Sequence, residues 1–94
     1  MLAEVYYAKD VYQMVGDSPL PLARELEVKY AKVCDIDDHN IDSIFSKLNW
    51  EPRKYIEYPL PEGILHTSMS VGDIIKFADG ELWYCSVLGW DLIT

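Results

Sequence analysis

The sequence has few basic residues: its 94 residues include eight Lys and Arg against sixteen Asp and Glu, a formal net charge of −8. Phosphate binding requires clustered Lys or Arg side chains, and the sequence has no such cluster. We therefore expect no direct binding of DNA or RNA. The acidity has two interpretations, solubility alone or a surface for a basic partner, and the sequence leaves both open.

Long hydrophobic runs are also lacking. No stretch approaches the roughly 18 apolar residues that a membrane span needs. The first four residues, Met-Leu-Ala-Glu, do not resemble the basic and apolar start of a signal peptide. We expect a cytoplasmic protein that does not bind a membrane.

Cysteine is scarce: Cys34 and Cys85 are the only two, and each lies inside an apolar run. Two cysteines do not make a disulfide scaffold. We expect two free thiols packed as small hydrophobic groups, although the sequence leaves a bond between them open.

Catalytic motifs are absent too: the sequence has no nucleophile elbow, Walker loop or dinucleotide-binding glycine turn. Residues 35–39 hold three Asp and one His, but Asn40 and Ser46 stand where a calcium loop needs Gly and Glu. His66 is followed by two hydroxyl residues, yet neighbours on a strand point to opposite faces. We expect no enzyme, catalytic residue, metal site or cofactor, and finding neither His39 nor His66 in a concave pocket would exclude an enzyme that uses them.

Half of the residues are hydrophobic, which is enough for one core in a single domain spanning residues 1–94. Residues 4–8 are rich in β-branched and aromatic side chains and predict a strand. Residues 10–15 predict one or two helical turns ended by Gly16, and residues 18–21, with two prolines, predict a loop.

From Glu25 to Ile36 the pattern alternates and predicts a strand with one buried face. The expected buried residues are Leu26, Val28, Tyr30, Cys34 and Ile36.

An apolar stripe with helical spacing follows, and it predicts an amphipathic helix. The stripe consists of Ile41, Ile44, Phe45 and Leu48. We expect Asp37 or Asp38 to cap its first turn and Pro52 to end it, followed by an irregular connector over residues 53–63.

Residues 73–77 and 81–87 predict two strands joined at Asp79-Gly80, a dipeptide in which both positions tolerate a positive φ. Residues 89–93 predict a third strand of this meander. The sequence therefore predicts an α+β fold, an antiparallel sheet of about four to five strands with one amphipathic helix packed on one face.

The region from Pro61 to Thr94 combines an acidic excess with several aromatic residues. Trp and Tyr dominate binding hot spots, and carboxylates attract basic partners. We expect a partner-binding surface formed by Asp73, Asp79, Glu81, Trp83, Tyr84, Trp90 and Asp91. Since Trp83 and Tyr84 are consecutive on one strand, at most one of them points inward.

Residues 66–75, with Trp83-Tyr84-Cys85 and residues 88–91 after them, resemble the C-terminal part of YodL-like accessory proteins of phages and mobile elements. The similarity covers about the last 55 residues, and its most specific part is residues 68–73. It implies a mobile-element setting and carries no catalytic residues.

In that setting we expect a protein that inhibits or modulates a host protein in the host cytoplasm. The leading target is a nucleic-acid-handling defence complex, as for an anti-CRISPR or anti-restriction protein whose carboxylates occupy a basic groove. The alternative is a self-associating structural module, a homodimer whose exposed aromatic residues form the interface.

Overall fold

The computed structural model describes residues 2–9, 26–86 and 88–93. Their elements are β1 (Leu2–Ala8), α1 (Leu26–Lys29), β2 (Tyr30–Asp37), α2 (Ile41–Trp50), α3 (Pro52–Tyr55), β3 (Ile74–Lys76), β4 (Leu82–Ser86) and β5 (Gly89–Leu92). The helical turns and loop predicted for residues 10–21 lie outside the described residues.

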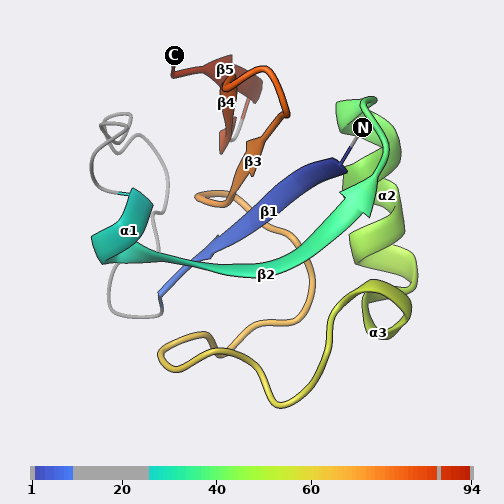
Figure 1. Cartoon of the computed structure of the whole chain (residues 1–94), viewed down its shortest axis with the longest axis vertical. Helices are drawn as coiled ribbons and strands as arrows, with labels where there is room; N and C mark the ends of the chain where they lie inside the picture. Colours follow the sequence, from blue (N-terminus) through green and yellow to red (C-terminus); the bar gives the residue numbers. More distant parts are fainter. Residues whose placement is uncertain (1, 10–25, 87, 94) are drawn as a thin grey trace.

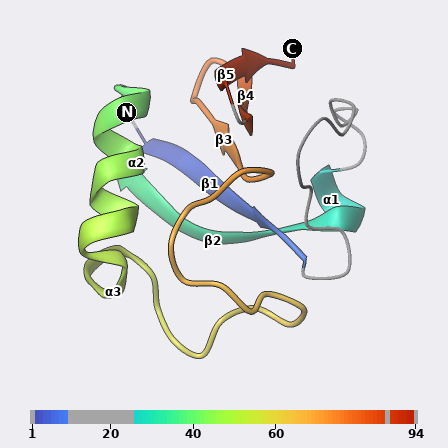
Figure 2. The ribbon, with the colours of Figure 1, turned by 180° about the vertical axis from the view of Figure 1, so that it is seen from behind.

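The strands form one antiparallel sheet in the order β2-β1-β3-β4-β5. α2 lies along one side of this sheet, and the connector from α3 to β3 crosses a face of it (Figures 1 and 2). The predicted α+β fold is confirmed, with the C-terminal meander as β3, β4 and β5.

The main core lies between one sheet face, α2 and the connector. Ile44 and Leu48 of α2 are fully buried there, and Ile41 and Phe45 pack against the same cluster. The predicted apolar stripe is therefore the buried side of the helix. Burying two such side chains and partly burying two more stabilises a helix that is too short to persist alone in water.

The opposite sheet face carries a second, smaller cluster. It consists of Ala8, Leu26, Tyr30, Ile74, Leu82 and Tyr84. Alternation along β1 assigns its side chains to the two clusters, since Val5 and Tyr7 belong to the main core and Ala8 to the other.

The prediction of one regular strand from Glu25 was wrong in two respects, the helical turn before β2 and the irregular pairing within β2. Residues Leu26–Lys29 form a helical turn, and Val28, expected to be buried, is 61% exposed. Within β2 the pairing shifts, because Val5 lies opposite Cys34 but Tyr6 lies opposite Lys32.

The residue between these two partners, Val33, is therefore an extra residue, a β-bulge. A bulge shifts the alternation by one residue, so that two residues on either side of it that would share a face of the sheet point to opposite faces. Tyr30 consequently belongs to the smaller cluster, whereas Ile36 belongs to the main core, and the two do not share a face as predicted.

The β3–β4 hairpin turns at the predicted Asp79-Gly80, but only Gly80 has a positive φ, of 96°. The backbone N–H of Phe77 donates to the carbonyl of Glu81 and that of Gly80 donates to the carbonyl of Phe77, both at 2.9 Å. The loop is thus longer than a two-residue turn, and its residues Ala78, Asp79 and Gly80 are exposed.

Candidate binding cleft

A cleft of about 390 Å³ lies between the start of α2 and the β3–β4 hairpin. These two segments lie side by side at one end of the molecule (Figures 1 and 2). The lining residues are His39, Asn40, Ile41, Asp42, Phe77, Asp79, Glu81 and Trp83. Three of them were predicted as partner-binding residues: Asp79, Glu81 and Trp83.

The helical wall of the cleft is held by capping interactions. The side-chain oxygen of Asn40 accepts from the backbone N–H of Ser43 at 2.9 Å, so Asn40 is the N-cap. The prediction of Asp37 or Asp38 as the cap was therefore wrong, because the N-cap is the residue directly before α2.

Asp38 supports this cap from outside the helix. Its carboxylate accepts from the backbone N–H of Asn40, the hydroxyl of Ser43 and the ammonium of Lys47, the last at 2.8 Å. The bonds from Lys47 and Ser43 hold the pKa of Asp38 well below its usual range. The helical wall is therefore fixed by Asn40, which lines the cleft, and by Asp38 next to it.

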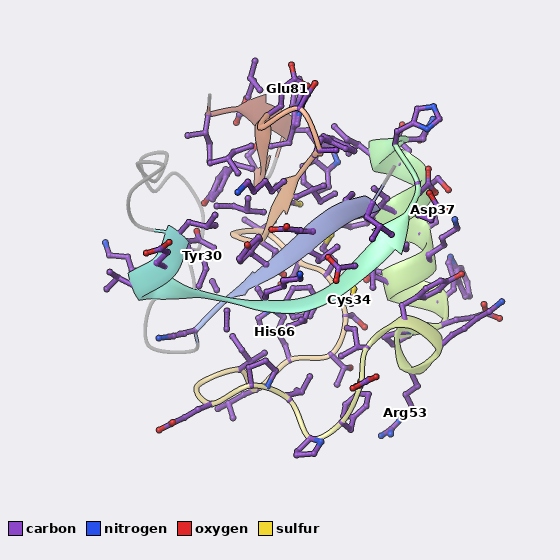
Figure 3. The ribbon with its side chains drawn as sticks, in the orientation of Figure 1. Tyr30, Cys34, Asp37, Arg53, His66 and Glu81 are labelled. Atoms are coloured by element: carbon purple, nitrogen blue, oxygen red, sulfur yellow. The ribbon has the colours of Figure 1, made fainter. Side chains whose placement is uncertain are left out.

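The hairpin wall is ordered by two local hydrogen bonds. The Asp79 carboxylate accepts from the backbone N–H of Glu81 at 3.0 Å, as turn carboxylates commonly do. The Glu81 carboxylate accepts from the indole Nε1–H of Trp83 at 3.3 Å. Figure 3 shows Glu81 at the hairpin end of the molecule, with Arg53 at the opposite end.

The charge of the cleft is one-sided. Asp42 and Asp79 are exposed and Glu81 is half-buried, whereas none of the lining residues is Lys or Arg. Within the part of the chain that the structure describes, none of these three carboxylates forms an ion pair. Three carboxylates beside two aromatic rings can attract a cationic group without breaking an existing ion pair.

Two other predicted residues lie on β5, outside the cleft. Trp90 is half-buried, packs against the main core and meets Phe45 edge to face, with ring centroids 6.1 Å apart. Asp91 is exposed. Trp90 is thus mainly a core residue, and Asp91 extends the acidic character of this half of the sheet.

The remaining two predicted residues, Asp73 and Tyr84, are corrected by the structure. Asp73 is 0% exposed and Tyr84 is 3% exposed, so neither side chain is accessible to a partner. Of the consecutive pair Trp83 and Tyr84, it is Tyr84 that lies in a core cluster and Trp83 that lines the cleft.

Asp73 instead joins three parts of the chain. Its carboxylate accepts from the backbone N–H groups of Ala8 at 2.9 Å and Ser70 at 2.8 Å. His66 Nε2 lies 3.0 Å from the same carboxylate, and its ring stacks on Tyr7 with centroids 4.6 Å apart. The Tyr7 hydroxyl donates to the carbonyl of Thr67 at 2.9 Å.

We refer to Asp73, His66, Ser70 and the backbone of Ala8 as the Asp73 junction. Burial raises the pKa of the Asp73 carboxyl, while the bond from His66 and the two backbone amides act to lower it. In the described part of the chain no buried side-chain polar atom is left without a partner. The hydrogen bonds of Asp73 are thus all to groups of the fold, which assigns it a structural role.

The two histidines occupy different settings. His39 lines the cleft, so the condition that would exclude a histidine enzyme is not met. The lining residues include no Ser, Thr, Cys or Lys that would act as a nucleophile beside it. Among the described residues, no group of three or more His, Cys, Asp or Glu is placed to hold a metal ion.

Both cysteines are free thiols. Burial raises the pKa of Cys34 to about 11 and that of Cys85 to about 11, which keeps both thiols protonated at neutral pH. Neither has the setting of a reactive cysteine.

A second hollow, of about 430 Å³, lies between β2 and the segment that follows α3. Lys32 and Asp35 on its rim pair with each other at 2.8 Å. Two of its three charged lining residues, Lys32 and Asp35, are already paired with each other, so this hollow has less to offer a charged partner than the cleft.

No family model matches the chain, and neither a curated protein nor a solved structure shows a significant match to it. Among the described residues, no helix is long and apolar enough to cross a membrane.

The sequence predicted the hairpin side of the cleft and missed the helical side, residues 39–42. Of these residues, His39 was considered only for a metal site or an enzyme and Ile41 only as part of the apolar stripe, and none of them was predicted to bind a partner. Nothing local indicates that the start of α2 lies beside the hairpin, because strand order determines this contact.

Proposed function

We propose that this protein binds a basic macromolecular partner through the cleft between α2 and the β3–β4 hairpin. The observation that carries the proposal is that three carboxylates, Asp42, Asp79 and Glu81, line the cleft with the half-buried ring of Trp83 and form no ion pair within the described residues. Core residues of interfaces are enriched in Trp, and surrounding charges guide the encounter.

The partner we propose is a host protein with a Lys- or Arg-lined groove, in the first place a nucleic-acid-handling defence complex. The net charge of −8 supports this choice, because an acidic surface is attracted to grooves that otherwise hold phosphates. The resemblance to YodL-like accessory proteins, stated from the residues alone, points to the same mobile-element setting. Inhibition of a CRISPR effector or a restriction enzyme is the form of activity that we propose.

The test measures binding of the purified protein to a CRISPR effector complex and to a restriction enzyme, at low and at high salt. The cleft variant carries Asp42→Asn, Asp79→Asn and Glu81→Gln together. The matched control carries Glu27→Gln, Glu57→Gln and Glu62→Gln, three exposed residues that do not line the cleft. Both variants lose three negative charges, so they separate the cleft from the overall charge.

We expect binding to at least one of these proteins, weakened by salt, lost in the cleft variant and largely retained in the control. Equal losses in the two variants would show that only net charge matters. Binding that is insensitive to salt and survives the cleft variant would contradict the proposal.

The alternative function, self-association, is favoured by the outer edge strand β5. Leu92 on this strand is 47% exposed and Leu88 just before it is 97% exposed. An edge strand with apolar side chains is a template for pairing with a second copy. Light scattering over a concentration series distinguishes the two: a dimer that Leu92→Lys dissociates, and that Leu65→Lys on the connector does not, favours self-association.

A further inference from the structure

We infer that the cleft is specific for the guanidinium group of an arginine side chain, in preference to the ammonium of a lysine. This inference rests on the proposed function and names the group of the partner that enters the cleft. It follows from the aromatic rings, the positions of the carboxylates and the size of the cleft.

The aromatic part is Trp83, with Phe77 beside it in the lining. Trp is the side chain on which a cation stacks best, and a planar guanidinium adds face-to-face contact that a compact ammonium does not make. The indole is also oriented, because its Nε1–H donates to Glu81. A ring held in place by the cleft's own carboxylate loses little freedom when a ligand stacks on it.

The carboxylates stand on different segments, with Asp42 in the first turn of α2 and Asp79 and Glu81 on the hairpin. A guanidinium presents five N–H donors in a fixed plane and can reach acceptors on more than one side. An ammonium is a more strongly hydrated point charge, so it gives up more hydration on entering. Acceptors on two walls therefore favour arginine.

The cleft volume of about 390 Å³ is at the lower end of the roughly 300–1,000 Å³ of small-molecule pockets. It suits one long side chain and not an entire folded element. The rest of the partner then lies outside, over the exposed hairpin loop and the start of α2.

The test uses three peptides of equal length that differ only at one central residue: arginine, lysine or citrulline. Citrulline has nearly the shape of arginine without its charge, so it separates shape from electrostatics. Binding to the 94-residue chain is measured by titration calorimetry at fixed salt. We expect the arginine peptide to bind about fivefold more tightly than the lysine peptide, as a cation–π contact implies, and the citrulline peptide to show no binding.

Two variants assign the effect to the cleft. Trp83→Leu should bring the arginine-to-lysine ratio close to one, and Asp42→Asn, on the surface of α2, should weaken both charged peptides without affecting the fold. Asp91→Asn, which removes an exposed carboxylate outside the cleft, serves as the control and should leave the affinities of the arginine and lysine peptides unchanged. An amide NMR spectrum of each variant verifies that it is folded.

Equal affinity for arginine and lysine, or a preference that persists in Trp83→Leu, would overturn the inference. Absence of binding by the arginine peptide would overturn it as well. These outcomes are separate from the proposed function, which stands or falls on salt-sensitive binding of the effector proteins and its loss in the triple cleft variant.

Discussion

The Asp73 junction and the cleft use the same chemical group in opposite ways. Asp73 is fully buried and accepts hydrogen bonds from two backbone amides and a histidine. The cleft carboxylates of Asp42 and Asp79 are exposed and have no cationic partner among the described residues. A buried carboxylate with its acceptor capacity used inside the fold stabilises the fold, whereas an exposed one without a cationic partner is available for binding.

The comparison predicts its largest effect for Asp73→Ala. Removing the carboxylate leaves the amides of Ala8 and Ser70 and the ring of His66 without their acceptor in the interior. The expected loss is about 3–5 kcal/mol of unfolding free energy, measured by urea denaturation. Asp91→Ala, at an exposed site, is the control. An unchanged urea midpoint for Asp73→Ala would show that the Asp73 junction does not stabilise the fold.

A smaller effect is expected for His66→Phe. The phenylalanine retains a ring that can stack on Tyr7 but lacks the nitrogen that lies 3.0 Å from Asp73 Oδ2. One lost hydrogen bond to a buried carboxyl group corresponds to about 1–3 kcal/mol. If the same denaturation experiment shows equal stability, the ring stacking and not the hydrogen bond is what His66 contributes.

Asp38→Asn should have a smaller effect still, because Asp38 lies near the surface at the start of α2. We expect a loss of about 1–2 kcal/mol at neutral pH from weaker bonds to Ser43 and Lys47. The pKa of Asp38 is lower in the folded protein than in the unfolded chain. Its stabilising effect is therefore present above the ordinary value of about 3.9 and is lost as the pH falls below it.

Denaturation of wild type and Asp38→Asn at a series of pH values measures this dependence. The difference between the two proteins should be constant near neutral pH and shrink in acid. A difference that grows in acid would have the wrong sign for a depressed pKa.

The smallest effect on stability is expected for the triple cleft variant with Asp42→Asn, Asp79→Asn and Glu81→Gln. In the described part of the chain its carboxylates form no ion pair, so their neutralisation should leave the urea midpoint close to that of the wild type. Affinity for a basic partner should fall at least tenfold at low salt. A large loss of stability would place these carboxylates with Asp73, as parts of the fold.

The parts of the fold that depend on local patterns were predictable. The spacing of Ile44 and Leu48 determines the buried side of α2, and Asp79-Gly80 marks the hairpin. The bulge at Val33 was not predictable from the sequence. An extra residue in a strand is recognised only from the pairing of that strand with its neighbour, which the sequence does not show.

The candidate site was predictable in part for a similar reason. Glu81 and Trp83 were identified from their charge and aromatic character, and both line the cleft. Asp73 has the same acidic character, but it is buried and hydrogen-bonded to Ala8 and His66. Ala8 is far from it in the sequence, and His66 lies in the irregular connector before β3. Composition identifies carboxylates, and only tertiary structure separates the buried ones from the accessible ones.

The most direct test of the central claim is an NMR titration of ¹⁵N-labelled protein with the arginine-containing peptide. The account predicts the largest shift changes at the amides of Asp42 and Asp79 and at the indole N–H of Trp83, with the amides of Ala8 and Ser70 unmoved. Largest changes on β5 or along the connector, or no change at saturating peptide, would contradict it.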